Sequence, residues 1–235
     1  MSAEFDKHAA SYDGGMDSPV KRALGDADSF IAVKARWLLR REPRLRAGGL
    51  SVLDYGCGAG DLMRVLAGLG VRAAFAGCDV SSGMLAEAAR RWPANLGPAP
   101  ELAVQDGART PFADGRFEVA AISAVLHHVP PPERAAVYSE LGRVLRPGGR
   151  LYVFEHNPRN PLVRHVVART PIDANAILLD AREVRSGLLA AGRYELETDY
   201  LMFMPPGIAV LRFVDRALAW LPLGGQYAVA ARKPA

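Results

Sequence analysis

Short apolar runs alternate with stretches in which apolar positions recur every three or four residues, and this alternation continues from residue 50 to residue 155. The runs predict buried strands, and the periodic stretches predict helices that pack on them. The predicted strands cover residues 50–54, 73–79, 101–105, 117–123 and 150–155. The predicted helices between them cover residues 61–69, 82–92 and 132–145. Such alternation favours a parallel sheet with helices on both faces.

The pattern differs on either side of this alternating region. Residues 4–13 predict a short helix, and residues 14–28 a loop that leads to a helix ending near residue 41. After residue 155, we expect a long connection at 156–176, a helix to about 191, strands at 194–204 and 226–232, and an amphipathic helix at 208–221. Long ordered connections in compact domains tend to serve function. We divide the chain into an N-terminal helical cap or lid segment, residues 1–47, and one globular domain, residues 48–235.

Three glycines follow the first predicted strand directly, at positions 56, 58 and 60, and Asp54 closes that strand. Because glycine has no β-carbon, such a turn can bend sharply and let a ligand approach its backbone and the amides of the next helix. A dinucleotide fingerprint, G-x-G-x-x-G, would require glycine where this chain has Asp61. The loop therefore indicates a nucleotide-like cofactor and disfavours a dehydrogenase.

The motif D-x-G-x-G-x-G, which starts at Asp54, resembles motif I of the class I S-adenosylmethionine-dependent methyltransferases. The stretch F-D-x-x-A-x-x-Y-D, residues 5–13, is similar to a helix with which many small-molecule members cover the cofactor, and Tyr12 would approach the cofactor's amino-acid end. The resemblance covers essentially the whole chain. It implies an α/β fold with a Rossmann-like seven-stranded sheet of order 3-2-1-4-5-7-6, strand 7 antiparallel. It also implies S-adenosylmethionine as cofactor and S-adenosylhomocysteine as product.

Each part of that cofactor requires a different neighbour. Asp79, which ends the second predicted strand, suits the ribose hydroxyls, and its alternative role is to cap the next helix. The resemblance implies that Asp106 accepts a hydrogen bond from the adenine amine and that Met84 packs on the adenine ring. The alternative for Met84 is a residue of the hydrophobic core without a role in binding. The expected cofactor-binding residues are Tyr12, Asp54, Gly56, Cys57, Gly58, Gly60, Asp79, Val80, Met84, Asp106, Gly107, Ala108 and Ser123.

Methyl transfer requires orientation of the acceptor and can use a base that removes its proton. His127 and His128 follow the fourth strand, and Glu155 and His156 follow the fifth, so these four are the catalytic candidates. Histidine titrates near neutral pH and therefore suits the role of a base. The alternative is that one of His127 and His128 is structural. The leading hypothesis is methyl transfer to an oxygen, nitrogen or carbon of a metabolite, natural product or lipid-like molecule. The alternative is a catalytically silent cofactor-binding scaffold or regulator.

Composition narrows the partners and the compartment. The 235 residues are 50% hydrophobic, enough for one ordinary domain, and the net charge of +4 comes largely from dispersed arginines without interleaved aromatics. No N-P-P-Y-type tetrad follows the fourth strand, so we expect a small-molecule substrate and no nucleic acid. We also expect a cytoplasmic monomer or homodimer without integral membrane association, since no uncharged run reaches roughly 18 apolar residues. Cys57 and Cys78 predict reduced thiols, with no disulfide and no zinc or other metal.

Overall fold

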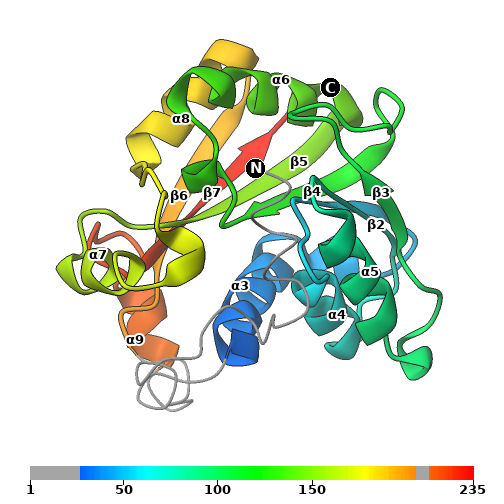
Figure 1. Cartoon of the computed structure of the whole chain (residues 1–235), viewed down its shortest axis with the longest axis horizontal. Helices are drawn as coiled ribbons and strands as arrows, with labels where there is room; N and C mark the ends of the chain where they lie inside the picture. The colour runs from blue at the N-terminus through cyan, green and yellow to red at the C-terminus, as the bar shows by residue number, and fades with distance from the viewer. Residues whose placement is uncertain (1–26, 205–211) are drawn as a thin grey trace.

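The computed structural model describes residues 27–204 and 212–235, and its centre is a seven-stranded sheet of order β3-β2-β1-β4-β5-β7-β6 (Figure 1). The strands are β1 (Ser51–Tyr55), β2 (Ala74–Asp79), β3 (Glu101–Val104), β4 (Phe117–Ser123), β5 (Leu145–His156), β6 (Glu195–Leu201) and β7 (Gln226–Arg232). β1 to β5 pair in parallel, and β7 runs antiparallel to both β5 and β6. The predicted fold class and strand order are confirmed.

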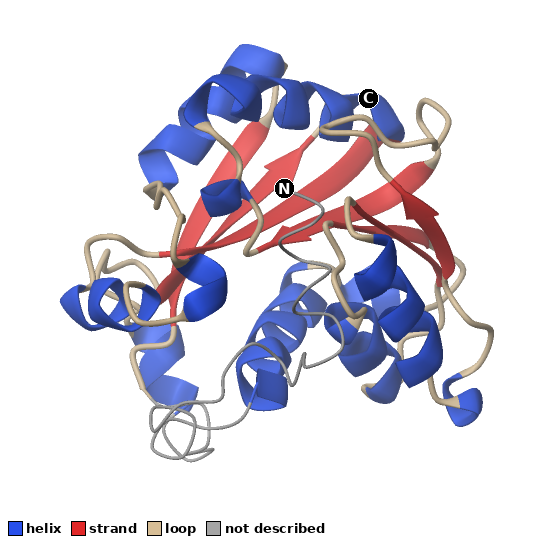
Figure 2. Cartoon of the chain, in the orientation of Figure 1, coloured by secondary structure: helices blue, strands red, loops and turns tan. Residues whose placement is uncertain are grey.

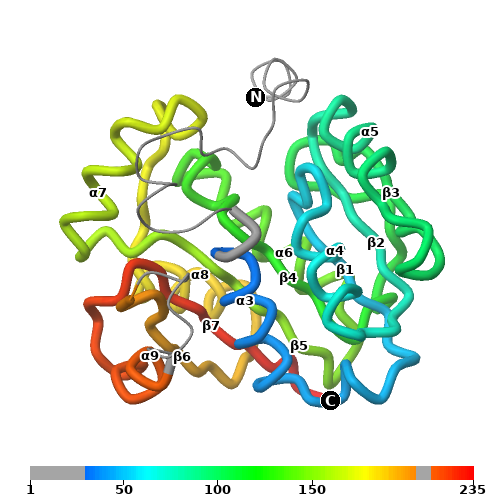
Figure 3. The backbone as a smooth tube through the Cα atoms, turned by 90° about the horizontal axis from the view of Figure 1, so that it is seen from below, coloured from blue at the N-terminus to red at the C-terminus, as the bar shows by residue number. Residues whose placement is uncertain are grey.

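Helices cover both faces of the sheet (Figure 2). One face carries α3 (Ala27–Arg41), α4 (Asp61–Gly68) and α5 (Ser82–Arg91), and the other carries α6 (Arg134–Val144) and α8 (Ala181–Ala191). Seen from below in Figure 3, α3 lies between α4 on one side and α9 (Arg212–Ala217) on the other. Among the described residues, none of these helices combines the length and apolar composition that a bilayer crossing requires.

Side chains of the central strands alternate between the two faces of the sheet, and they form one hydrophobic core under the helices of each face. In β4, Ala120 and Ile122 pack in the core under α6 and α8, whereas Val119 and Ala121 pack in the core under α3 and α4. Successive side chains of a strand point to opposite faces, so a strand buried on both sides is apolar throughout. This is why the run at 117–123 could be identified as a central strand.

Two predicted segments differ from the structure. The connection expected at 156–176 contains a helix, α7 (Pro161–Val167), and a 3₁₀ turn, Pro171–Asp173. The side chain of Asn160 accepts hydrogen bonds from the N–H groups of Leu162 and Val163 and thus caps α7. The helix begins at Pro161, and proline is favoured in a first turn. β5 begins five residues earlier than expected, because Leu145 pairs with Phe117 ahead of a register shift.

Other predicted segments are partly described. The helix expected at 4–13, with Tyr12, lies outside the described residues, as do residues 208–211 of the amphipathic helix expected at 208–221. The described part of that helix is α9, which ends at Ala217. The division of the chain at residue 47 stays a prediction.

Candidate active site

A cavity of about 810 Å³ opens beside the carboxyl ends of β1, β2 and β4. Ligands bind at this edge in open parallel sheets. All but two of the described residues expected to bind the cofactor line the cavity, and the two that do not are Gly60 and Asp106. Of the four catalytic candidates, His127, His128 and His156 line it, whereas Glu155 does not. The cavity therefore collects residues that lie more than 100 positions apart in the sequence.

The glycine loop after β1 is tightly packed on one side and open on the other. Gly56 has φ +67°, and a β-carbon there would lie 2.5 Å from a methyl group of Val125. Gly58 has φ +51°, and a β-carbon there would meet nothing within 4 Å. Gly58 lines the cavity, so its backbone is accessible to a ligand. Gly60 instead caps α4 in the left-handed conformation and faces Ala88.

Asp79 holds the glycine loop and does not cap a helix. Its carboxylate accepts the backbone N–H of Gly58 and that of Ser81, each at 2.9 Å. The N-cap of α5 is Ser81, whose hydroxyl accepts the N–H of Met84 at 3.1 Å. The capping role considered for Asp79 therefore belongs to Ser81, and Asp79 remains at the cavity wall.

Asp54 and Lys34 bring opposite charges into the buried part of the cavity. Burial, with the charges of Asp79 and Asp61 adding to it, raises the pKa of Asp54 to about 7. Lys34, on α3, donates to the hydroxyl of Ser123 at 2.9 Å, and burial lowers the pKa of Lys34 to about 8. Sequence analysis missed Lys34. The available signal was its position in the apolar stripe of its helix, three or four residues from Ile31 and Leu38.

The residues after β3 differ by one position from the expectation. Asp106 is exposed, and its backbone pairs with that of Arg109 in a turn. Gln105 is buried and lines the cavity, and its amide donates to the carbonyl of Gly107 at 2.9 Å. Within the described part of the chain, the side-chain oxygen of Gln105 has no hydrogen-bond partner. Gly107 and Ala108 line the cavity as expected.

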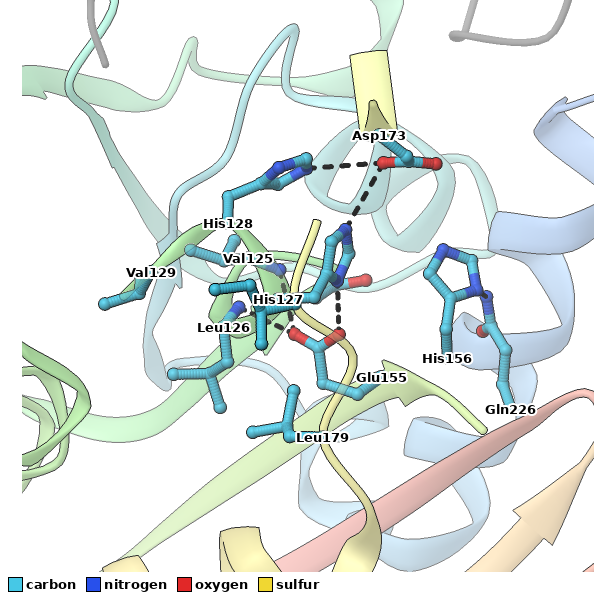
Figure 4. Close-up of polar contacts among 12 residues, drawn as sticks. Val125, Leu126, His127, His128, Val129, Glu155, His156, Asp173, Leu179 and Gln226 are labelled. Carbon is cyan, nitrogen blue, oxygen red and sulfur yellow. Dashed lines mark hydrogen bonds and ion pairs between the residues drawn. The ribbon is translucent and has the colours of Figure 1, made fainter. Parts of the chain in front are cut away.

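Glu155 lies behind the histidine pair and organises the turn after β4 (Figure 4). One carboxylate oxygen accepts the backbone N–H of Val125 at 2.9 Å and that of Leu126 at 2.7 Å. The other oxygen lies 2.5 Å from Nδ1 of His127. Burial alone would raise the pKa of Glu155, but the charge of His127 and its hydrogen bond lower it to about 2. Glu155 is thus placed to orient His127.

His127 and His128 both point toward Asp173, which ends the 3₁₀ turn after α7 (Figure 4). Nε2 of each imidazole lies 3.4 Å from the same oxygen, Oδ1 of Asp173. Although burial alone lowers the pKa of His127, the charge of Glu155 and the bonds to both carboxylates raise it to about 9. Sequence analysis missed Asp173, because no motif links this residue to the histidines some 45 positions earlier.

His156 lies beside this cluster but faces a different partner. Its ring centroid is 5.1 Å from that of His127, and its Nδ1 lies 3.4 Å from the side-chain amide nitrogen of Gln226. Burial lowers the pKa of His156 well below its usual range, so the ring is neutral at physiological pH.

Comparison with known proteins agrees with this geometry. A family model described as a methyltransferase domain matches residues 52–149. A demethylmenaquinone methyltransferase of Parafrankia sp. is 41% identical over 194 residues, which cover 76% of this chain and 72% of that protein. Another, from Beutenbergia cavernae, is 44% identical over 146 residues, and the match covers 60% of this chain and only 56% of that protein.

Solved structures agree on the fold. Magnesium protoporphyrin IX methyltransferase from Synechocystis PCC 6803, crystallised with S-adenosylhomocysteine, superposes with a TM-score of 0.67, covering 99% of this chain and 95% of that one at 21% identity. Identity this low supports the fold alone. The match to the Parafrankia protein extends over most of both sequences. Together with the motif I loop and the strand order, it shows that this chain belongs to the class I S-adenosylmethionine-dependent methyltransferase superfamily.

Proposed function

We propose that this chain transfers the methyl group of S-adenosylmethionine to a small, largely apolar acceptor. The observation that carries the proposal is one continuous cavity, whose lining runs from the glycine loop and Asp79 to the apolar side chains of α7. Its volume of about 810 Å³ lies toward the upper end of the range of ligand pockets. A donor and an acceptor can therefore meet inside it without crossing a barrier of protein.

The polar residues at one end suit the parts of the cofactor. Asp79 offers a carboxylate to the ribose hydroxyls, and the accessible backbone of Gly58 lies beside it. Asp54 is the acidic group for the ammonium of the amino-acid end. For the adenine amine, Gln105 is better placed than Asp106, because Gln105 lines the cavity and its buried side-chain oxygen has no hydrogen-bond partner within the part of the chain that the structure describes.

Methyl transfer is an in-line displacement at the methyl carbon. The acceptor's electron pair forms the new bond, the carbon–sulfur bond breaks, and its electron pair stays on sulfur, which leaves as a neutral thioether. The acceptor's proton goes to a base or to water. Because the sulfonium is already a good leaving group, the protein contributes mainly orientation and exclusion of water.

A hydroquinone is the acceptor class that we test first. Both relatives named above are demethylmenaquinone methyltransferases, and side chains such as Leu162, Val166 and Ile172 make the wall at α7 and the turn after it apolar. A ring carbon of the reduced quinol is electron-rich and can attack the methyl group, whereas the oxidised quinone is electrophilic. We therefore expect turnover with the reduced form only.

The experiment incubates the full chain with methyl-labelled S-adenosylmethionine and demethylmenaquinone, either chemically reduced or oxidised. We expect labelled product and S-adenosylhomocysteine in equal amounts from the reduced form. Asp79→Asn should lower kcat/KM for the cofactor by about tenfold or more, since an amide accepts less well than a carboxylate. Asp114→Asn, at an exposed carboxylate outside the cavity lining, is the matched control and should leave turnover unchanged.

The outcomes separate the two hypotheses. Cofactor binding without label in demethylmenaquinol, or in any acceptor of a wider panel of phenols and quinols, would favour the silent binding protein. Label in phenolic oxygen and none in quinol carbon would keep the transferase and replace the acceptor class.

A further inference from the structure

Three side chains that could each offer one metal-ligand atom converge at the cavity wall. The atoms are Nε2 of His127, Nε2 of His128 and Oδ1 of Asp173, and all lie within 4.8 Å of one another. Two of the three separations are 3.4 Å. In a tetrahedral zinc site with bonds of roughly 2.0–2.1 Å, neighbouring ligand atoms are about 3.4 Å apart. Two edges of this triangle therefore already have the spacing of a metal site.

Direct contacts also link the three side chains without an ion, but both contacts are long. A hydrogen bond from imidazole nitrogen to carboxylate oxygen is normally about 2.7–3.2 Å long, and both separations here are longer. In Figure 4, the two imidazoles approach the same Asp173 oxygen from different directions. An ion placed between the three ligand atoms would contact all of them.

Glu155 supplies the outer support that metal-binding histidines usually have. Its carboxylate lies 2.5 Å from Nδ1 of His127, on the side of the ring opposite Asp173. Binding of an ion would displace the proton on Nε2, while the proton on Nδ1 stays shared with this carboxylate and keeps Nε2 directed at the cluster. Two backbone amides, of Val125 and Leu126, in turn fix Glu155. The ring is thereby held in one orientation before any ion arrives.

We propose that His127, His128 and Asp173 form a site for a divalent transition-metal ion, with Zn²⁺ as the representative. Two imidazoles and one carboxylate suit zinc or ferrous iron, whereas magnesium and calcium prefer oxygen ligands. Three protein ligands leave at least one coordination position, which faces the cavity because all three residues line it. The expectation of no metal considered only the two cysteines, and this proposal departs from it.

The site also joins two separate parts of the chain. The histidines follow β4 on the 3₁₀ turn Leu126–His128, whereas Asp173 ends the turn Pro171–Asp173 beyond α7. A bound ion would tie the 156–176 connection to the turn after β4. An acceptor oxygen could then occupy the remaining coordination position. The site does not depend on the proposed reaction, because its occupancy can be measured without cofactor or acceptor.

The test uses the untagged full chain, dialysed against a chelator and then titrated with Zn²⁺ by calorimetry. We expect one ion per chain and no binding of Mg²⁺ at the same concentrations. His128→Ala and Asp173→Asn should each weaken the affinity about 100-fold, and Glu155→Gln about 10- to 100-fold through loss of the outer contact. His165→Ala, at an exposed histidine of α7 outside the cluster, is the matched control and should bind as the wild type does.

A second measurement keeps the proposal testable if a variant fails to fold. Co²⁺ added to the wild type should give visible absorption bands of a cobalt ion with imidazole ligands, and one equivalent of Zn²⁺ should abolish them. Absence of stoichiometric Zn²⁺ binding, absence of the cobalt bands, or wild-type affinity in folded His128→Ala and Asp173→Asn would each overturn the site.

Discussion

Asp54 and Asp79 are chemically identical, yet their surroundings give them different properties. The carboxylate of Asp79 accepts two backbone N–H groups at the cavity wall, whereas Asp54 is buried beside two other acidic residues. Both could be found from the sequence, since each ends a strand next to the glycine loop. Asp173 could not, because a distant part of the chain brings it to the site. Lys34 was missed although its position in the apolar stripe of its helix was a signal. Gln105 lines the cavity in place of the predicted Asp106, because the sequence pattern does not specify which residue after β3 turns inward.

The raised pKa of Asp54 predicts how stability depends on pH. Its folded-state pKa of about 7 lies above the ordinary value of 3.8, so the folded state binds its proton more tightly than the unfolded state. This contribution is fully present below pH 3.8 and is lost as the pH rises through 7. Relative to Asp54→Asn, the wild type should therefore lose unfolding free energy between pH 4 and 7, by at most about 4 kcal/mol.

Urea denaturation of the ligand-free protein at pH 5, 6, 7 and 8 measures this difference. Asp114→Asn, at an exposed carboxylate, should follow the wild-type curve at every pH. If the unfolding free energies of Asp54→Asn and the wild type instead change in parallel with pH, Asp54 is ionised throughout the range and its pKa is not raised.

At the scale of elements, α7 is the clearest difference between expectation and structure. Its signals were present in the sequence, an asparagine followed directly by proline at positions 160 and 161, but the helix is only seven residues long. A helix this short has little intrinsic stability, so its cap and its tertiary contacts decide whether it forms. The expectation that this connection serves the site stays a prediction, and four side chains of α7 line the cavity.

The cap of α7 gives a test at this scale. Asn160→Ala removes the bonds to the N–H groups of Leu162 and Val163 and should lower stability by about 1 kcal/mol. Because α7 lines the end of the cavity away from the glycine loop, we expect a higher KM for the acceptor and an unchanged affinity for S-adenosylhomocysteine.

The matched control is Asp180→Ala. Asp180 caps α8 through the N–H groups of Arg182 and Glu183 and does not line the cavity. It should lower stability by a similar amount and leave KM unchanged. An equal rise of KM in both variants would mean that global destabilisation, and not the wall at α7, sets acceptor binding.

At the scale of the whole molecule, the alternation of apolar runs was sufficient to predict a parallel sheet with helices on both faces, whereas the strand order was predicted from the resemblance to the class I methyltransferases. Strands such as β4 are buried on both faces, and this makes their sequences distinctive. The same pattern does not specify which loops meet above the sheet, because loops contact one another through individual side chains without periodicity. The binding edge could therefore be predicted, whereas the acceptor side of the cavity required the structure.

We expect the glycine loop to hold S-adenosylmethionine or its product and not to hold a dinucleotide. Calorimetric titration of the full chain with S-adenosylhomocysteine and, separately, with NAD⁺ tests it directly. We expect one S-adenosylhomocysteine per chain and no NAD⁺ binding. Gly58→Ala should weaken binding at least about tenfold, since its new methyl group lies on the accessible side of the loop. Gly70→Ala, at a positive-φ glycine that also has open space but does not line the cavity, should bind normally. Binding of NAD⁺ in place of S-adenosylhomocysteine, or equal affinity in Gly58→Ala and the wild type, would contradict the account.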